Sequence, residues 1–193
     1  MSFPNKTIED LKAAFLGEST AKAKYTVYAG RAEERGFKYE AALFRAAALA
    51  ESFHARNHKN VLRKLGVEDP AAGSYVAEAL EPGVGDRDLI AAALRDAMNG
   101  EIEERDNMYP RMIENAKEEN QPDAVVSEEQ ALYAEAQHAA LYEKALMAIG
   151  LPHEIAHFLV CPICGATWDG EAPEICPVCG VKHISFRKIA SQF

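Results

Sequence analysis

Five glutamates stand at positions where amphipathic helices would place apolar side chains. They continue apolar stripes that recur every three or four residues, although glutamate is almost never buried without a partner. Two of them are followed three residues later by histidine, as Glu51-Ser-Phe-His54 and Glu135-Ala-Gln-His138. That spacing places a carboxylate and an imidazole on one helix face, one turn apart. The other three glutamates are Glu18, Glu101 and Glu104.

These glutamates and histidines predict a site for two metal ions. Isolated carboxylates in a protein core would cost several kcal/mol each or would take up protons. Two cations between the helices remove that cost, and single glutamates from two helices with Glu-x-x-His from two others form the ligand set of di-iron carboxylate bundles. Ligation rich in carboxylates with one histidine per metal suits iron or manganese better than zinc. A solvated acidic stripe is the alternative, and the second Glu-x-x-His motif argues against it.

Two tyrosines share the helix faces of the glutamates. Tyr25 follows Glu18 by seven residues, and Tyr109 follows Glu101 by eight. We predict that their hydroxyls form hydrogen bonds with the ligating carboxylates, although spacing alone supports an aromatic core position equally well. His58, one turn beyond His54, is interpreted as a bystander.

All the cysteines lie in the last 33 residues, as Cys161-Pro-Ile-Cys164-Gly and Cys176-Pro-Val-Cys179-Gly. Each Cys-x-x-Cys turn, here called a knuckle, presents two sulfurs to one metal, and the following glycine lets backbone N–H groups point at the thiolates. Two knuckles predict a tetrahedral four-thiolate site, with iron and zinc both open. Disulfides are the alternative, and a reducing compartment disfavours them. Because so short a segment cannot hold a core unaided, we expect the metal to fold it.

A further pattern, His153-Glu-Ile-Ala-His157, matches the His-Glu-x-x-His motif of zinc proteases. That motif requires a long helix, a third ligand and a substrate cleft. Here it follows Gly150 and Pro152, and the first cysteine comes four residues later. We therefore interpret it as a short linker helix.

Four long helical segments are expected to position the metal ligands. Residues 66–86 are rich in proline and glycine, and so long a loop suits a crossover between the two ends of a bundle. Pro110 is expected to kink or unwind the third segment. The pattern predicts a mainly α fold, a ferritin-like four-helix bundle with one long crossover. The expected helix ends lie at or near Thr7, Gly36, Gly66, Asp86, Glu119, Pro122 and Gly150.

Charge and composition argue against two classes of protein, those that bind nucleic acid and those that span a membrane. The 21 Lys and Arg residues against 30 Asp and Glu residues give a net charge of -9, which argues against nucleic-acid binding. The longest apolar run, Leu89–Leu94, is far shorter than a membrane span. No secretory signal is visible at the N-terminus, so we expect a cytoplasmic protein. The expected domains are a bundle over residues 1–150, a linker over 151–158 and a metal-binding tail over 159–193.

Together these motifs resemble the rubrerythrin family, in which a ferritin-like di-iron bundle is fused to a rubredoxin-like domain. The resemblance covers essentially the whole chain. It rests on Gly17-Glu18-Ser19 with Tyr25, Glu51-Ser-Phe-His54, Gly100-Glu101-Ile-Glu-Glu104 through Met108-Tyr109-Pro110, Glu135-Ala-Gln-His138, and the two knuckles. A departure from rubredoxins is Thr167-Trp168, where those proteins commonly carry tyrosines.

The resemblance implies the following chemistry. Two non-haem irons would be held by Glu18, Glu51, His54, Glu101, Glu104, Glu135 and His138, with Glu104 and His54 as alternative ligands to one iron. The four cysteines would bind one redox-active iron. The reaction would be reduction of hydrogen peroxide to water, with electrons from a reduced pyridine nucleotide through a separate reductase. An iron-oxidising protein, or a bundle with a structural zinc ribbon that acts as a binding module, remains an alternative.

The resemblance also implies a head-to-tail homodimer. From His138 to Gly150 the helix extends by about 18 Å, and the linker adds more. We therefore expect that a chain's own two metal sites lie too far apart for fast electron transfer, and that one subunit's tail serves its partner's bundle.

Overall fold

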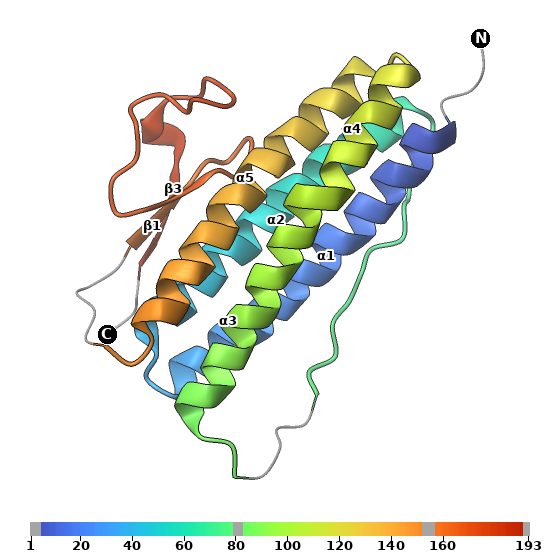
Figure 1. Ribbon diagram of the computed structural model, residues 1–193. Coiled ribbons are helices and arrows are strands. Elements are labelled where there is room, and N and C mark those ends of the chain that lie inside the picture. Colours follow the sequence, from blue (N-terminus) through green and yellow to red (C-terminus); the bar gives the residue numbers. More distant parts are fainter. Residues whose placement is uncertain (1–4, 79–82, 152–156, 191–193) are drawn as a thin grey trace.

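The chain folds into a helical bundle with a small β-rich tail docked on one side (Figure 1). The computed structural model describes residues 5–78, 83–151 and 157–190. The bundle has four long segments, the third of which is interrupted, and this confirms the expected fold class. The helices are α1 (Asn5–Glu34), α2 (Lys38–Lys64), α3 (Asp86–Glu103), the π-helical turn η1 (Glu104–Met108), α4 (Tyr109–Glu118) and α5 (Pro122–Ala148).

The long connection after α2 is the expected crossover. Its described residues before position 79 run along the outside of α1 toward the opposite end of the bundle, where α3 begins (Figure 1). At Gly73 a side chain has no room, because an added Cβ would lie 1.9 Å from the Thr20 hydroxyl oxygen. Tyr75 packs edge-on against Tyr28, with ring centroids 6.0 Å apart. These contacts hold the crossover against the bundle.

The start of α1 differs from the prediction. Thr7 does not cap its own helix, because α1 already includes Asn5 and Lys6. Instead the Glu119 carboxylate accepts hydrogen bonds from the Thr7 hydroxyl, at 2.7 Å, and from the backbone N–H groups of Lys6 and Thr7. The free N–H groups of the first turn are thus capped by a residue more than a hundred positions away, which local spacing does not reveal.

The third segment unwinds just before Pro110. Proline has no N–H, so it cannot continue the regular helical hydrogen bonds. The chain widens into the π-helical turn Glu104–Met108, and the Tyr109 N–H bonds the carbonyl of Glu104 five residues back. π-helical turns inside helices frequently accompany functional sites. Here the turn lies between Glu101 and Tyr109, both fully buried.

Two apolar cores lie on either side of a polar middle layer. Leu11, Phe15 and Leu62 belong to the core at one end of the bundle, and Phe44 and Tyr142 belong to the core at the other. Each such buried side chain contributes about 1.5–3 kcal/mol. These cores hold the helices together while the layer between them is filled with carboxylates and imidazoles.

The tail is a three-stranded antiparallel sheet with the order β2-β1-β3. Its strands are β1 (His157–Val160), β2 (Thr167–Asp169) and β3 (Arg187–Ala190). The ring of Trp168 stacks on Phe186 with centroids 5.0 Å apart. Strand β1 begins inside the segment expected to be a linker. Most of the protease-like pattern lies outside the described residues, and its last residue, His157, is in a strand.

The tail docks on α2 and α5 of its own chain (Figure 1). Tyr39 and Lys144 both donate hydrogen bonds to Asp169, at 2.9 and 2.6 Å. The expectation that a chain's own tail lies far from its metal ligands is therefore wrong for this structure. That expectation extended the chain beyond α5, whereas Gly150, with φ of +80°, ends the helix and the tail lies back along the bundle.

Among the described helices, none combines the length and the apolar character needed to cross a bilayer.

Glu128 on α5 is buried without a hydrogen bond. Its side chain has no exposure, and neither carboxylate oxygen has a hydrogen-bond partner among the described residues. Burial, reinforced by the charge of Asp10, raises the pKa of Glu128 to about 8. The folded chain therefore carries a proton on Glu128 between pH 4.5 and pH 8, where an unfolded chain has lost it.

The raised pKa of Glu128 predicts that the free energy of unfolding falls as the pH rises. The contribution of this protonated group to stability is full below pH 4.5. It declines as the pH rises, because the unfolded chain releases its proton first, and it is lost as the pH passes about 8. In Glu128→Gln the side chain stays neutral, so the unfolding free energy above pH 8 should rise by about 1–3 kcal/mol relative to the parent. Urea denaturation at pH 5 and pH 8.5 measures this difference. Glu143→Gln, at an exposed position on α5, is the matched control, and an equal pH slope in Glu128→Gln and the parent would contradict the prediction.

Candidate metal centre

The polar middle layer contains two groups of metal-ligating side chains. One group is Glu18, Glu51, His54 and Glu135, and the other is Glu51, Glu101, Glu135 and His138. Within each group the ligand atoms lie within 4.8 Å of one another. Glu51 and Glu135 belong to both groups, so these two carboxylates are placed to bridge a pair of cations. The structure thus brings six of the seven predicted ligands together.

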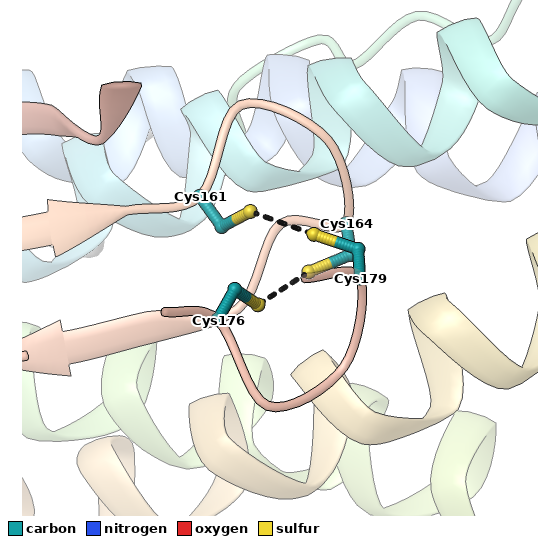
Figure 2. Close-up of side chains that lie close together, drawn as sticks. All are labelled: Cys161, Cys164, Cys176 and Cys179. Atoms are coloured by element: carbon teal, nitrogen blue, oxygen red, sulfur yellow. Dashed lines mark hydrogen bonds between the residues drawn. The ribbon is translucent and has the colours of Figure 1, made fainter. Parts of the chain in front are cut away.

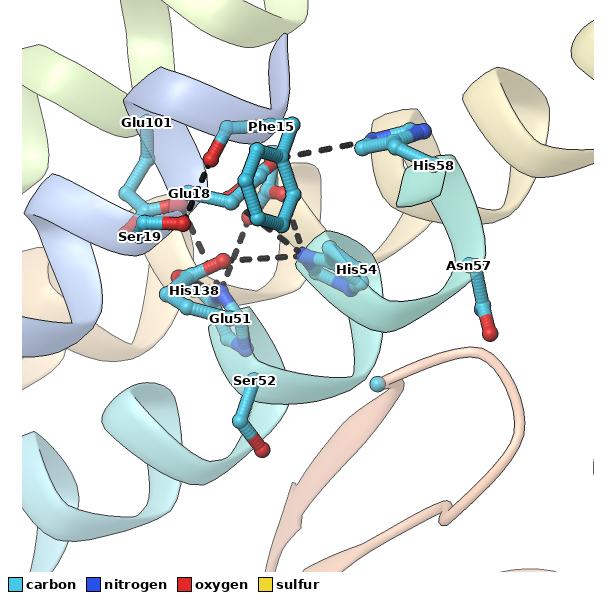
Figure 3. Close-up of polar contacts among 12 residues, drawn as sticks. Phe15, Glu18, Ser19, Glu51, Ser52, His54, Asn57, His58, Glu101 and His138 are labelled. Carbon is cyan, nitrogen blue, oxygen red and sulfur yellow. Dashed lines mark hydrogen bonds and ion pairs between the residues drawn. The ribbon is translucent and has the colours of Figure 1, made fainter. Parts of the chain in front are cut away.

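The six side chains reach the layer from four helices. Glu18 comes from α1, Glu101 from α3, and the two Glu-x-x-His pairs come from α2 and α5. In Figure 3 the side chains of Glu18, Glu51, His54 and His138 converge between these helices. The three-residue spacing places Nδ1 of each histidine 2.9 Å from an oxygen of the glutamate one turn before it. Helical periodicity therefore builds each pair, and the bundle brings the pairs face to face.

The carboxylates leave oxygen atoms for cations. Among the described residues, one oxygen each of Glu18, Glu51, Glu101 and Glu135 is buried without a hydrogen-bond partner. Buried polar atoms are nearly always paired, so four orphaned oxygens in one layer need an explanation. Two cations ligated by four carboxylates and two imidazoles satisfy all of them, and hard or intermediate metals prefer this donor set. The residues present therefore fit a two-metal centre.

The pKa values of the carboxyls show how unfavourable the layer is without cations. Burial and the charges of neighbouring glutamates raise the pKa of Glu51 to about 7 and hold that of Glu135 well above its usual range. Burial also acts to raise the pKa of Glu18, but the imidazoles of His54 and His58, 3.8 and 3.9 Å from its oxygens, outweigh burial and keep that pKa low.

The histidines balance part of this charge. Burial by itself would lower the pKa of His54 and His138. The nearby carboxylates, Glu135 beside His54 and Glu101 beside His138, outweigh burial and hold both pKa values well above the usual range. Without metal the layer thus stays buried by sharing protons, and cations would displace those protons on binding.

Glu104, the seventh predicted ligand, lies beside the layer rather than within it. It belongs to neither group of ligand atoms and starts the π-helical turn η1. A carboxylate oxygen of Glu104 lies 4.0 Å from the position of a Cβ at Gly17, next to Glu18. Burial, together with the charges of Glu18 and Glu135, raises the pKa of Glu104 well above its usual range. The structure therefore places Glu104 near the first group, with His54 already inside it.

The two predicted tyrosines contact the carboxylates crosswise. Tyr25 on α1 donates a 2.6 Å hydrogen bond to Glu101 on α3, and Tyr109 on α4 donates one to Glu18 on α1. Sequence spacing had associated each tyrosine with the glutamate on its own segment. The hydroxyls instead reach across the bundle, because a side chain that points into the layer meets the facing helix. Each bond ties one ligand helix to another.

His58 belongs to neither ligand group, as expected of a bystander to the metals, but it is joined to the site through Tyr109. It is fully buried, and its Nε2 lies 3.0 Å from the hydroxyl oxygen of Tyr109. The Tyr109 hydrogen goes to Glu18, so His58 Nε2–H donates to Tyr109, and Nδ1 accepts the 2.9 Å hydrogen bond from Ser127. Burial lowers the pKa of His58, which keeps it neutral, as this pattern requires. Its position seven residues after Glu51 places it on the metal-facing side of α2 and was the available signal.

The cysteines form the second site. The four sulfurs of Cys161, Cys164, Cys176 and Cys179 converge from two loops in Figure 2. Two sulfur–sulfur distances across the loops are 3.4 and 3.5 Å. Tetrahedral coordination with metal–sulfur bonds of about 2.3 Å has sulfur–sulfur edges of about 3.8 Å. The four thiols therefore already stand close to the spacing that one metal ion requires.

The knuckles share one backbone design. The N–H of Gly165 bonds the carbonyl of Cys161, and the N–H of Gly180 bonds that of Cys176. Hydrogen bonds from Cys164 and from backbone N–H groups lower the pKa of Cys161 to about 5. Burial raises the pKa of Cys179 to about 12. A thiolate thus already forms at one position, and a metal ion would supply the charge that ionises the others.

The two metal sites are in direct contact. The carbonyl oxygen of Cys164 lies 3.1 Å from Nε2 of His54, and a carbonyl can only accept, so the imidazole N–H donates. Arg56 and Asn57 on α2 donate to the carbonyls of Pro162 and Ile163 in the same knuckle. A chain of covalent bonds and one hydrogen bond therefore connects a sulfur of the tail site to a ligand of the bundle site.

Comparisons with known proteins agree with both halves of the chain. The family model for rubrerythrin matches residues 9–146, and that for the rubrerythrin rubredoxin-like domain matches residues 160–187. Rubrerythrin-2 of Clostridium acetobutylicum is 36% identical over 97% of this chain and 99% of its own length. Nigerythrin of Nitratidesulfovibrio vulgaris is 39% identical over 90% of this chain and 81% of its own length.

A solved structure shows the same arrangement of the backbone. The fully reduced, all-ferrous state of nigerythrin superposes with a TM-score of 0.83 at 34% identity, covering 94% of this chain and 86% of that chain. The relatives span both the bundle and the tail. With a family match over most of its length and a carboxylate–histidine bundle joined to a four-cysteine tail, the chain belongs to the rubrerythrin family.

Proposed function

We propose that this protein is a non-haem di-iron peroxidase that reduces hydrogen peroxide to water. Each peroxide consumes two electrons and two protons and yields two water molecules. The observation that carries the proposal is the contact between the Cys164 carbonyl and His54, which joins the two metal sites. A structural zinc ribbon that serves only to bind a partner has no need of such a contact, whereas an electron relay does.

The metals proposed are two irons in the bundle and one iron in the tail. When bound, the bundle irons would supply the two electrons that cleave the oxygen–oxygen bond, and the tail iron would replace them. The related nigerythrin structures are described as fully reduced, mixed-valence and partially reduced states, so that protein exists in several oxidation states. The donor set here, with carboxylates in excess and one imidazole per metal, suits iron that changes its oxidation state.

The chain's own residues prepare the site for a change of oxidation state. We propose Glu18, Glu51, Glu101, Glu135, His54 and His138 as ligands, with Glu104 and His54 as alternatives for one metal. Glu104 lies beside the first ligand group on a π-helical turn, while His54 lies inside that group. Tyr25 and Tyr109 hold Glu101 and Glu18 in place during such an exchange.

Electrons are proposed to come from a reduced pyridine nucleotide through a separate reductase. The first knuckle faces the bundle, so the reductase would approach the second. Cys179 in the second knuckle is partly exposed, and Ile175 and Ile184, which flank this knuckle in the sequence, are 57% and 92% exposed. An exposed apolar rim next to a metal-ligating sulfur is suited to a transient protein contact.

We also propose a head-to-tail homodimer. Residues 152–156 separate the last described residue of the bundle from the first of the tail. Exchange of identical tails between two chains would preserve every contact seen here within one chain, so it costs little. The domain division into residues 1–150, 151–158 and 159–193 stays a proposal, with β1 starting at His157.

Reaction with peroxide is the direct test of the proposed activity. Protein reduced without oxygen and then mixed with hydrogen peroxide should reoxidise about tenfold faster, or more, than protein mixed with dioxygen, as followed by the visible absorption of the red four-thiolate iron. Glu51→Ala should abolish the fast phase, because it removes a bridging ligand. Cys161→Ser, in which the consumption of peroxide is measured instead, should keep one rapid oxidation of the bundle site but lose steady turnover. Faster reaction with dioxygen would favour an iron-oxidising protein, and colourless protein with zinc in the tail would exclude the relay.

Mixed dimers test the exchange of tails. When a Cys161→Ser chain is paired with a Glu51→Ala chain, exchange brings the intact tail to the intact bundle, and about half of the parent turnover should remain. If each tail instead docks on its own chain, the intact bundle keeps a broken tail and the intact tail keeps a broken bundle, so turnover would be lost. The matched control pairs a chain carrying both substitutions with a parent chain, for which the two arrangements predict the opposite results. Turnover in the control pair alone would refute the exchanged dimer.

A further inference from the structure

The tail contacts both imidazoles of the bundle site from outside. Nδ1 of His54 and Nδ1 of His138 face the carboxylates. Nε2 of each ring points the other way, toward the first knuckle and the strand that follows it. For His54 the partner is the backbone carbonyl of Cys164, and for His138 it is the hydroxyl of Thr167. The tail therefore lies where the outer hydrogen-bond partners of metal-bound histidines belong.

The hydroxyl of Thr167 has only one hydrogen, and the structure shows where it goes. Thr167 Oγ1 donates a 2.8 Å hydrogen bond to the carbonyl oxygen of Gly165. Toward His138 the same oxygen can then only accept, and His138 Nε2 lies 3.1 Å away. In the neutral imidazole that a metal would bind, the hydrogen must therefore lie on Nε2. The lone pair of His138 is thereby left on Nδ1, the atom that faces the ligand group.

Thr167 is itself held firmly. Its side chain is 2% exposed, and its backbone N–H donates a 3.0 Å hydrogen bond to Gln137 on α5. Thr167 also pairs with Val160 in the sheet. Gly165 allows this close approach, because a Cβ at that position would lie 2.1 Å from Nε2 of His54. A residue larger than glycine would push the knuckle away from both imidazoles.

We propose that Thr167 is a positioning residue of the two-metal site, which holds His138 in the tautomer and ring orientation that present Nδ1 to the metal. The tail then completes the bundle site in addition to relaying electrons. The consecutive carbonyls of Cys164 and Gly165 serve the two histidines, directly for His54 and through Thr167 for His138. This role rests on the two-metal site of the proposed function but does not require that its reaction be peroxide reduction.

The test compares metal binding in Thr167→Val, Thr167→Ser and the parent. The full chain is first loaded with one zinc in the cysteine site, and Co²⁺ is then titrated into the bundle and followed by its ligand-field absorption. Valine keeps the shape of the side chain without the hydroxyl, so the weaker of the two Co²⁺ affinities should fall about 10- to 100-fold. Serine retains the hydroxyl and should stay within about twofold of the parent.

A docking control separates this role from a general loosening of the tail. Lys144→Met removes the hydrogen bond from Lys144 to Asp169 but leaves His138 untouched. It should not change Co²⁺ affinity. The proposal is overturned if Thr167→Val binds Co²⁺ as the parent does, or if Thr167→Ser or Lys144→Met loses as much affinity as Thr167→Val. Because cobalt binding needs no turnover, a failed peroxide reaction would leave this result standing.

Discussion

The burial of carboxylates in the middle of a helical bundle is the constraint on which the rest of the structure depends. Glu18, Glu51, Glu101 and Glu135 are fully buried, and each leaves one oxygen without a hydrogen bond among the described residues. Such groups destabilise a core unless protons or cations neutralise them. The apolar cores on either side hold the helices at a fixed spacing, so the layer forms a site that two cations fit.

Cross-bundle hydrogen bonds turn this layer into a rigid site. Tyr25 ties α1 to α3, and Tyr109 ties α4 to α1. His58 extends the second tie to α5 through Ser127. The π-helical turn before Pro110 separates Glu101 from Tyr109 and carries Glu104 beside the ligand group. Local unwinding thus supplies an additional carboxylate without breaking the ties around it.

The first knuckle of the tail has two roles that depend on the same residues. It supplies Cys161 and Cys164 to the four-thiolate site. Its Cys164 carbonyl bonds Nε2 of His54 directly, and its Gly165 carbonyl bonds the Thr167 hydroxyl that contacts Nε2 of His138. Gly165 serves both roles, since its φ of +77° shapes the knuckle and its missing side chain permits contact with His54. A change that moves the tail would therefore disturb the four-thiolate site and the outer contacts of the two histidines together.

The sequence by itself determined the helices, the two Glu-x-x-His pairs and the two knuckles, because ligands three residues apart are positioned by local geometry. It did not reveal that Glu119 caps α1, that the tyrosines reach across the bundle, or that His58 joins Tyr109. It also did not reveal where on the bundle the tail docks, since the direction of the chain after Gly150 is not set by helix length. Only the tertiary structure decided these contacts, because each joins residues far apart in the chain whose side chains meet only after the helices and the tail have packed.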